Sequence, residues 1–272
     1  ELLNEFIKLD TEIKYTTDLI TIKNKLKDTN IIVLCTYQSS ELLKGTRFDL
    51  GLFDEAHKTV NSNKFGFCLD DKNCNIDERI YFTATPRYYK GYNETCISMN
   101  NKNIYGNEIF SYSYLQAKNN NYVLDFQIVG YIVPQKLDDI IMEKYIKQDN
   151  LNIKSEILIS AIQIAKHIQE NKECNKILTY HNTVNNAIEF KKTLYYVLDK
   201  FNINASVYCI SGKTSMSKRY EIFNDFERDD ISIICSSKVL NEGVDIPCVN
   251  TIMFVDPRTS TVDVTQCIGR AM

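Results

Sequence analysis

Asp54-Glu55-Ala56-His57 follows directly on an apolar run, residues 50–53, which we predict to be a buried β-strand. Two adjacent carboxylates at the carboxyl end of a strand lie where ligands enter an open α/β sheet. One carboxylate there can hold Mg²⁺ through water while its neighbour orients or deprotonates an attacking water. A bare Asp-Glu pair is more often a solvated turn, so the interpretation depends on the residues that accompany it.

The rest of the chain predicts an α/β fold. Short apolar runs, which we expect to be strands, occur at residues 31–35, 50–53, 80–82, 177–180, 205–210, 231–235 and 251–255. The early runs are apolar on both faces, as in parallel strands that helices cover on both sides. Helix-period patterns separate the later runs, and Ser155 is the expected N-cap of the first of these helices. This alternation predicts a parallel sheet in each half of the chain.

The length of 272 residues favours two domains. Residues 134–152, rich in Asp, Lys and Asn, interrupt the α/β alternation, and we expect them to connect the two domains. The predicted domains are therefore residues 1–133 and 134–272. The chain begins with Glu1 rather than Met, and we expect it to be a fragment of a larger protein.

Composition restricts the setting. The sequence contains no run of eighteen apolar residues, so we expect no membrane span. The N-terminal residues do not resemble a signal peptide. Nine cysteines without a Cys-x-x-Cys pair favour a reduced, intracellular protein over disulfides or structural zinc. The net charge of −3 does not indicate a nucleic-acid-binding protein, although a local basic groove is sufficient for such binding. Neither the compartment nor the oligomeric state follows from the sequence.

Further polar residues follow other predicted strands. Thr83 and Thr85 come after the run at 80–82, where two hydroxyls can hydrogen-bond the acidic pair and sense a phosphate. Gly243 permits a close backbone approach after the run at 231–235. We expect Arg270 to begin or lie on a helix, from which its guanidinium can reach a phosphate. Taken singly, these residues have ordinary interpretations as a strand end, a turn and a surface charge.

Taken in order, these motifs resemble the core of the superfamily 2 DEAH-box helicases. The similarity to helicase motifs II, III, V and VI is carried by Asp54-Glu55-Ala56-His57, Thr83-Ala84-Thr85, Glu242-Gly243-Val244-Asp245 and Gln266-Cys267-Ile268-Gly269-Arg270-Ala271. Thr36-Tyr37-Gln38-Ser39 resembles the segment before motif II that contacts nucleic acid, and Tyr180-His181-Asn182 resembles motif IV. Residues 255–258, together with Asp263 before Gln266, are similar to the restriction-enzyme-type and viral branch.

The resemblance implies two RecA-like lobes with parallel sheets, the first of them incomplete. ATP, with Mg²⁺, would bind between the lobes, and nucleic acid would lie across both. The protein would be an ATP-dependent helicase or translocase, and the family branch favours DNA over RNA as the partner. Unwinding, polarity and pathway do not follow from it.

The resemblance also implies roles for single residues. Asp54 would hold Mg²⁺, and Glu55 would polarise the water that attacks the γ-phosphate. His57 and Gln266 would face each other across the lobes, while Arg270 would act as an arginine finger. The remaining implied contacts are coupling through Thr83 and Thr85, nucleotide binding by Gly243 and Asp245, and nucleic-acid binding by Thr36, Gln38 and Ser237.

One part of the family pattern is missing. A phosphate-binding Gly-x-x-x-x-Gly-Lys-[Ser/Thr] loop should precede Asp54, but the first glycine is Gly45. We therefore expect the isolated chain to be inactive. Gly212-Lys213-Thr214-Ser215 copies the end of such a loop, but Val207 stands where its first glycine should be.

Three hypotheses remain open at this point. The favoured one is the helicase core. In the resembled family, motif VI usually extends to a second arginine beyond Ala271, so we expect the chain to end within the motif. The second is a helicase-like module that binds nucleic acid without hydrolysis. The third is a nucleotide kinase or small NTPase built on Gly212-Lys213-Thr214.

Overall fold

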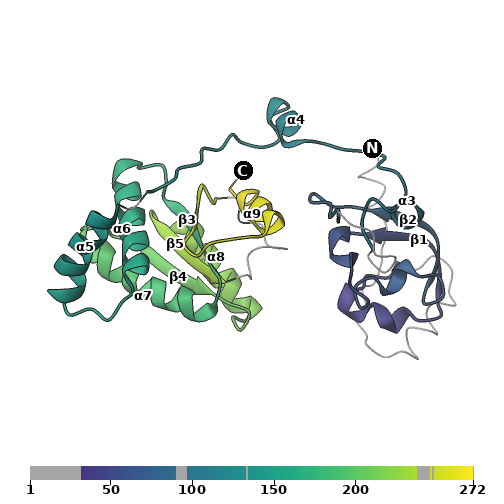
Figure 1. Ribbon diagram of the computed structural model, residues 1–272, viewed down its shortest axis with the longest axis horizontal. Helices are drawn as coiled ribbons and strands as arrows, with labels where there is room; N and C mark the ends of the chain where they lie inside the picture. The colour runs from purple at the N-terminus through teal and green to yellow at the C-terminus, as the bar shows by residue number, and fades with distance from the viewer. Residues whose placement is uncertain (1–31, 90–96, 133, 238–245, 247, 272) are drawn as a thin grey trace. The chain divides into compact units, whose positions relative to one another are not determined.

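The computed structural model describes residues 32–89, 97–132, 134–237, 246 and 248–271 (Figure 1). These residues form two compact units, and the division lies between Ser111 and Tyr112. That division falls earlier in the chain than the domain boundary predicted after residue 133. The assignment of residues 1–133 and 134–272 to two domains stays a prediction.

The first unit is built on two parallel strands. β1 (Arg47–Phe53) pairs with β2 (Asn75–Tyr81), with Arg47 opposite Asn75 and Phe53 opposite Tyr81. The strands predicted at 50–53 and 80–82 are therefore confirmed within β1 and at the end of β2. Because the two strands run in the same direction, the residues that follow Phe53 and Tyr81 emerge at the same edge of the sheet.

Short helical turns surround these strands. They are η1 (Tyr37–Leu43), η2 (Ala56–Thr59), η3 (Phe67–Leu69) and α3 (Lys102–Tyr105). A small core of buried apolar side chains joins the strands to the turns and consists of Phe53, Ala56, Cys68, Cys74 and Ile76.

Two sequence predictions for this unit are wrong. Residues 32–35 of the strand predicted at 31–35 are not in a strand, because no described strand pairs with them. Leu50 and Leu52, predicted to be buried, are 51% and 63% exposed. Apolar runs record only the side chains of the strand itself, and within the described residues nothing packs closely over these two.

The stretch expected to connect the domains, residues 134–152, is mainly helical. Before it lies α4 (Tyr114–Asn119), which begins with a capping box formed by Ser113 and Gln116. Further along, α5 (Gln135–Ile141) runs directly into the π-helix η4 (Met142–Lys147). Ile141 is buried in a core of the second unit, so this part of residues 134–152 packs as an element of that unit.

The second unit contains a four-stranded parallel sheet with the order β4-β5-β3-β6. Its strands are β3 (Lys176–His181), β4 (Ser206–Ile210), β5 (Ser232–Ser237) and β6 (Thr251–Phe254). Its other helices are α6 (Ser155–Glu170), α7 (Val184–Lys200), α8 (Met216–Arg228) and α9 (Thr261–Ile268). The predicted α/β fold with parallel sheets is confirmed.

Alternating side chains of the sheet pack against helices on its two faces. Ile177 of β3 lies in one core with residues of α6 and α7, including Phe190. Leu178, next in sequence, lies in a second core with Phe226 of α8. Ser155 begins α6 but does not cap it, because Lys154 occupies the N-cap position. Among the described helices, none is long and apolar enough to span a membrane.

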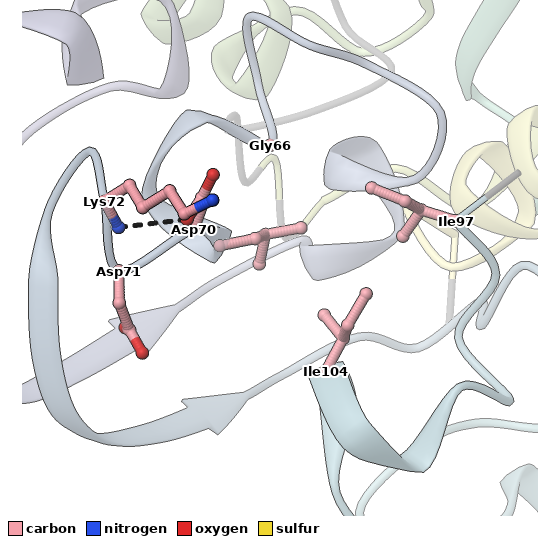
Figure 2. Close-up of a pocket in the computed structure, with 7 residues that line it drawn as sticks. Gly66, Asp70, Asp71, Lys72, Ile97 and Ile104 are labelled. Carbon is pink, nitrogen blue, oxygen red and sulfur yellow. Dashed lines mark hydrogen bonds between the residues drawn. The ribbon is translucent and has the colours of Figure 1, made fainter. Parts of the chain in front are cut away.

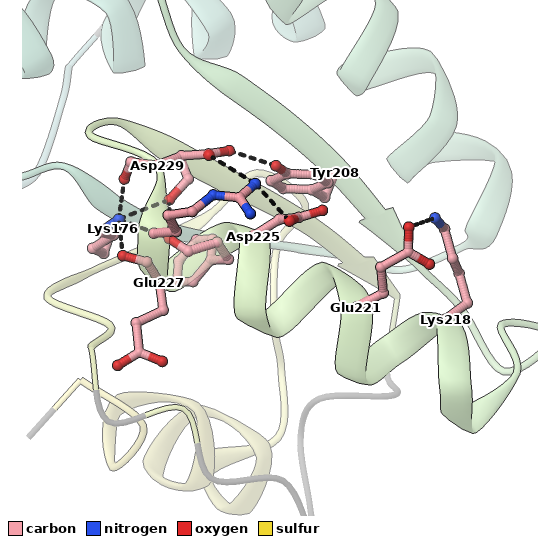
Figure 3. A network of polar contacts seen from close by, with 10 residues as sticks. Lys176, Tyr208, Lys218, Glu221, Asp225, Glu227 and Asp229 are labelled. Atoms are coloured by element: carbon pink, nitrogen blue, oxygen red, sulfur yellow. Dashed lines mark hydrogen bonds and ion pairs between the residues drawn. The ribbon is translucent and has the colours of Figure 1, made fainter.

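A buried lysine joins the start of β3 to the end of α8. Lys176 is only 9% exposed, and its ammonium donates hydrogen bonds to the carbonyls of Phe226, Glu227 and Asp229 (Figure 3). The last carbonyls of a helix have no partner within the helix and carry partial negative charge. The Lys176 ammonium therefore caps α8 at its C-terminus.

We predict that Lys176→Met destabilises the second unit by about 2–4 kcal/mol, because buried carbonyls lose a charged donor. Urea unfolding of the chain measures this change. The control is Lys218→Met on the same helix, where an exposed pair with Glu221 should contribute at most about 0.5 kcal/mol. Equal losses in the two variants would contradict the capping role.

Candidate functional site

The acidic motif begins where β1 ends. Beyond the last strand pair, the amide of Phe82 donates to the carbonyl of Phe53 at 2.9 Å, and the amide of Ala56 donates to the carbonyl of Phe82 at 2.9 Å. These bonds continue the β1–β2 pairing into the two loops. As a result, Asp54 and Glu55 lie next to the segment that leads to Thr83.

Glu55 has a backbone conformation that residues other than glycine rarely adopt. Its φ is 48° and its ψ is 43°, which places it in the left-handed region. Its amide donates a hydrogen bond to Oδ1 of Asp54 at 2.9 Å. A strained residue of this kind persists only where its surroundings hold it, and such residues cluster at functional sites.

His57 connects the acidic motif to the two threonines. The residue is 1% exposed, and its Nδ1 lies 2.9 Å from Thr83 Oγ1 and 3.4 Å from Thr85 Oγ1. The same nitrogen lies 3.3 Å from Oε2 of Glu55. The amide of Thr85 donates to Thr83 Oγ1 at 3.1 Å. The structure therefore gathers five of the predicted site residues at one sheet edge, namely Asp54, Glu55, His57, Thr83 and Thr85. Their individual roles stay predictions.

The carboxylates at this edge suit Mg²⁺ better than a metal that needs a cage of protein ligands. Mg²⁺ is typically held by one or two carboxylates together with waters and phosphates. Asp54 and its neighbour Glu55 supply such hard oxygen donors. Within the part of the chain that the structure describes, no group of three or more His, Cys, Asp or Glu side chains is arranged to hold a metal.

The segment expected to contact nucleic acid lies against the acidic motif. Thr36 and Gln38 are exposed, as a surface contact requires. Tyr37 between them is partly buried, and its hydroxyl donates to the carbonyl of Asp54 at 2.6 Å. Tyr37 has no role among the predictions made from the sequence. The only available indication was an aromatic residue between two polar ones.

In the second unit the predicted residues occupy the carboxyl edge of the sheet and α9. Ser237 ends β5 opposite His181 of β3 and is 5% exposed. Both amide atoms of the Gln266 side chain are buried and have no hydrogen-bond partner among the described residues. Gly243 and Asp245 lie outside the described residues.

Arg270 does not lie on a helix, which corrects the sequence prediction. α9 ends at Ile268, Gly269 is its C-cap, and the amide of Arg270 donates to the carbonyl of Cys267 at 3.1 Å. Gly269 keeps right-handed backbone angles, with φ −58° and ψ −12°, and the chain passes into a turn there. Arg270 therefore sits in the turn that follows the helix.

A network at the end of β3 fixes the segment that precedes α9. Oδ2 of Asp256 accepts hydrogen bonds from the amide of Asn182 at 2.6 Å and from the side chain of Asn186 at 2.8 Å. Nη2 of Arg258 donates to the carbonyl of His181 at 3.3 Å. Burial lowers the pKa of His181 to about 4, against an opposing effect of Asp256 and with a smaller contribution from Arg258. His181 is therefore neutral near pH 7.

A cavity of about 480 Å³ opens elsewhere in the first unit (Figure 2). None of the predicted site residues lines it. Its walls are formed by Gly66, Leu69, Asp70, Asp71, Lys72, Ile97 and Ile104. The candidate site is thus a cluster of side chains at a sheet edge and is separate from this cavity.

The helicase conserved C-terminal domain family matches residues 154–272, which cover the sheet of the second unit and α9. This match supports the C-terminal lobe of a superfamily 2 helicase core in residues 154–272. The predicted resemblance is thereby confirmed for this lobe.

Relatives and solved structures agree with this helicase lobe. A helicase-named protein of African swine fever virus is 27% identical over 267 residues, which cover 96% of this chain and 28% of the relative. A helicase-named protein of Sulfolobus islandicus filamentous virus is 24% identical over 237 residues, which cover 84% of this chain and 40% of the relative. The chain thus spans less than half the length of either relative.

One solved structure shares the fold over most of the chain. It is the ATP-dependent Type ISP restriction-modification enzyme LlaBIII bound to DNA, with a TM-score of 0.71 and 21% identity. The similarity covers 86% of this chain and 18% of that enzyme. The RecA-like fold of the helicase lobe is confirmed by this comparison.

We predict that Glu55→Gly is more stable than Glu55→Ala by about 1 kcal/mol, because glycine adopts positive φ without the clash that Cβ causes. Hydrogen exchange of the β1 and β2 amides measures the difference. At Glu78, which lies in the regular strand β2, the same pair of substitutions should give the opposite order. The same order at both positions would exclude strain at Glu55.

Proposed function

We propose that the protein containing this chain is an ATP-dependent helicase or translocase that hydrolyses ATP between two RecA-like lobes. The observation that supports this most directly is the cluster at the edge of β1 and β2. There, His57 joins the acidic motif to Thr83 through the 2.9 Å contact of its Nδ1. The helicase C-terminal lobe in the same chain supplies the second half of the proposed site.

In this proposal the two carboxylates divide the chemistry. Asp54 would hold Mg²⁺, which neutralises charge on the phosphates of ATP when it is bound. Glu55 would orient and polarise the attacking water. Its strained backbone and the bond from its amide to Asp54 give the two carboxylates fixed relative positions. His57, Thr83 and Thr85 would relay the state of this site to the rest of the lobe.

The second lobe would contribute from the other side of the nucleotide. Gln266 would face His57, and Arg270 would stabilise charge that develops on the transferred phosphoryl group. The buried and unpaired amide of Gln266 supports a partner outside the described part of its own unit. Gly243 and Asp245 would contact the nucleotide in the same way as in the resembled family.

Nucleic acid would bind through its backbone. Thr36 and Gln38 are exposed for such contacts, and Ser237 would contribute through the end of β5. Contacts of this type position a strand without reading its sequence. We propose DNA as the partner, and the DNA in the structure of the Type ISP enzyme supports that choice.

The hypothesis of an NTPase built on Gly212-Lys213-Thr214 is less well supported. The turn uses its own polar groups: the amide of Ser211 donates to Thr214 Oγ1 at 3.0 Å, and the amide of Lys213 donates to Ser211 Oγ at 3.3 Å. Arg219 donates to the carbonyl of Ser211 at 3.2 Å and holds the turn closed. A phosphate-binding loop needs its amides free to point at the phosphate.

We predict that Glu55→Gln in the full-length protein lowers ATP turnover by at least about 100-fold, because a general base contributes about that much or more. ATP affinity should stay within about threefold. Turnover with and without single-stranded DNA, together with nucleotide binding, measures both. Glu78→Gln, at an exposed position of β2, is the control and should retain full turnover. Loss of turnover and binding together in Glu55→Gln would contradict the assigned role.

We also predict that affinity for single-stranded DNA falls steeply with salt. Each phosphate that the protein neutralises releases counterions, so the logarithm of the binding constant decreases with the logarithm of salt by about 0.7 per phosphate. Fluorescence anisotropy of labelled DNA at a series of salt concentrations gives this slope. A slope near zero would remove the proposed backbone contacts, and it would support a protein that acts on nucleotides alone.

A further inference from the structure

Tyr37 has a different environment from its two neighbours. Thr36 and Gln38 lie on the exposed side of their segment, where nucleic acid would contact them under the proposed function. The side chain of Tyr37 points into the unit instead, and its hydroxyl donates to the carbonyl of Asp54 at 2.6 Å. Three consecutive residues thus connect an exposed surface to the backbone of the acidic motif.

The ring of Tyr37 is fixed between other aromatic rings. It stacks on Phe53, with ring centroids 6.5 Å apart, and on Phe65, with centroids 6.0 Å apart. The hydroxyl of Ser40 donates to the carbonyl of Tyr37 at 2.8 Å and fixes its backbone as well. Burial, and to a lesser degree the charge of Asp54, raise the pKa of the Tyr37 hydroxyl. The group therefore remains protonated and can act only as a donor to the carbonyl.

The accepting carbonyl belongs to the peptide that joins the two carboxylate residues. On one side of this peptide is Asp54, whose Oδ1 accepts the amide of Glu55 at 2.9 Å. On the other side is Glu55, and a rotation of the peptide changes its φ, which is 48°, and with it the direction of its side chain. A hydrogen bond to this carbonyl therefore constrains both carboxylates together.

We propose that Tyr37 is a positioning residue that couples contact of nucleic acid at Thr36 and Gln38 to the orientation of Asp54 and Glu55. The inference rests on the proposed function. It assigns the ATP site a second connection to the bound nucleic acid, in addition to the connection through Thr83 and Thr85. Binding of a strand shifts the segment of Tyr37, and the rigidly stacked ring transmits the shift to the Asp54 carbonyl. ATP hydrolysis then responds to occupancy of the surface.

The test is Tyr37→Phe in the full-length protein, since this substitution keeps the ring stacking and removes only the hydroxyl. We expect the ratio of kcat with single-stranded DNA to kcat without it to fall about fivefold, the factor that corresponds to about 1 kcal/mol for one hydrogen bond. A merely structural role would lower both rates by the same factor and leave this ratio unchanged. An unchanged ratio would therefore overturn the inference.

A matched control removes the same kind of bond elsewhere. The hydroxyl of Tyr195 in the second unit donates to the carbonyl of Val207 at 3.0 Å, and Tyr195→Phe should leave the ratio as in the wild type. A second measurement guards against partial misfolding of Tyr37→Phe. Hydrogen exchange of the amides of residues 54–57 should slow on addition of single-stranded DNA in the wild type and not in Tyr37→Phe. Equal slowing in both proteins would also overturn the coupling.

The same experiment separates the two proposals. If the wild-type protein shows no ATP turnover, or none that DNA stimulates, the proposed function fails whatever Tyr37→Phe does. If the wild type is stimulated and Tyr37→Phe is stimulated equally, the proposed function stands and the role of Tyr37 is excluded.

Discussion

Phe53 and Tyr81 lie opposite each other at the carboxyl ends of β1 and β2, and two backbone bonds through Phe82 carry this pairing into the following loops. The contact between His57 and Thr83 depends on that register. A slip of one residue would shift one strand by about 3.3 Å and turn its side chains to the opposite face. The cluster would then lose its contacts, since a 2.9 Å hydrogen bond does not survive such a shift.

The same pairing explains how a strained residue is retained beside the cluster. Glu55 adopts a left-handed conformation that costs about 1–2 kcal/mol for a side chain with Cβ. On either side of it the backbone is fixed, by the Tyr37 hydroxyl at Asp54 and by the carbonyl of Phe82 at Ala56. Ala56 is also fully buried in the core of the first unit. Packing around the motif therefore balances the cost of presenting two carboxylates in fixed positions.

The sequence predicted features that depend on local patterns and missed those that depend on distant partners. Strands β3 to β6 were predicted because a run of apolar side chains by itself indicates a strand that is covered on both faces. Exposure of Leu50 and Leu52 was missed because their pattern matches that of a covered strand. The bond of Tyr37 spans 17 residues and leaves no periodic trace. The helical position predicted for Arg270 was wrong for a local reason, since α9 ends at Ile268.

His57 and Gln266, which belong to different units, differ in their hydrogen bonding. This difference bears on how the proposed site would work. Nδ1 of His57 contacts Thr83 and Glu55 within its own unit. Gln266 has a buried amide with no partner in the described part of its unit, and each unsatisfied group of this kind costs about 1–3 kcal/mol. Under the proposed function, a state in which a bound nucleotide pairs with Gln266 would recover that free energy. A ligand shifts a conformational equilibrium only by its differential affinity for the two states. In the proposed cycle, pairing of the buried amide of Gln266 would supply such a difference.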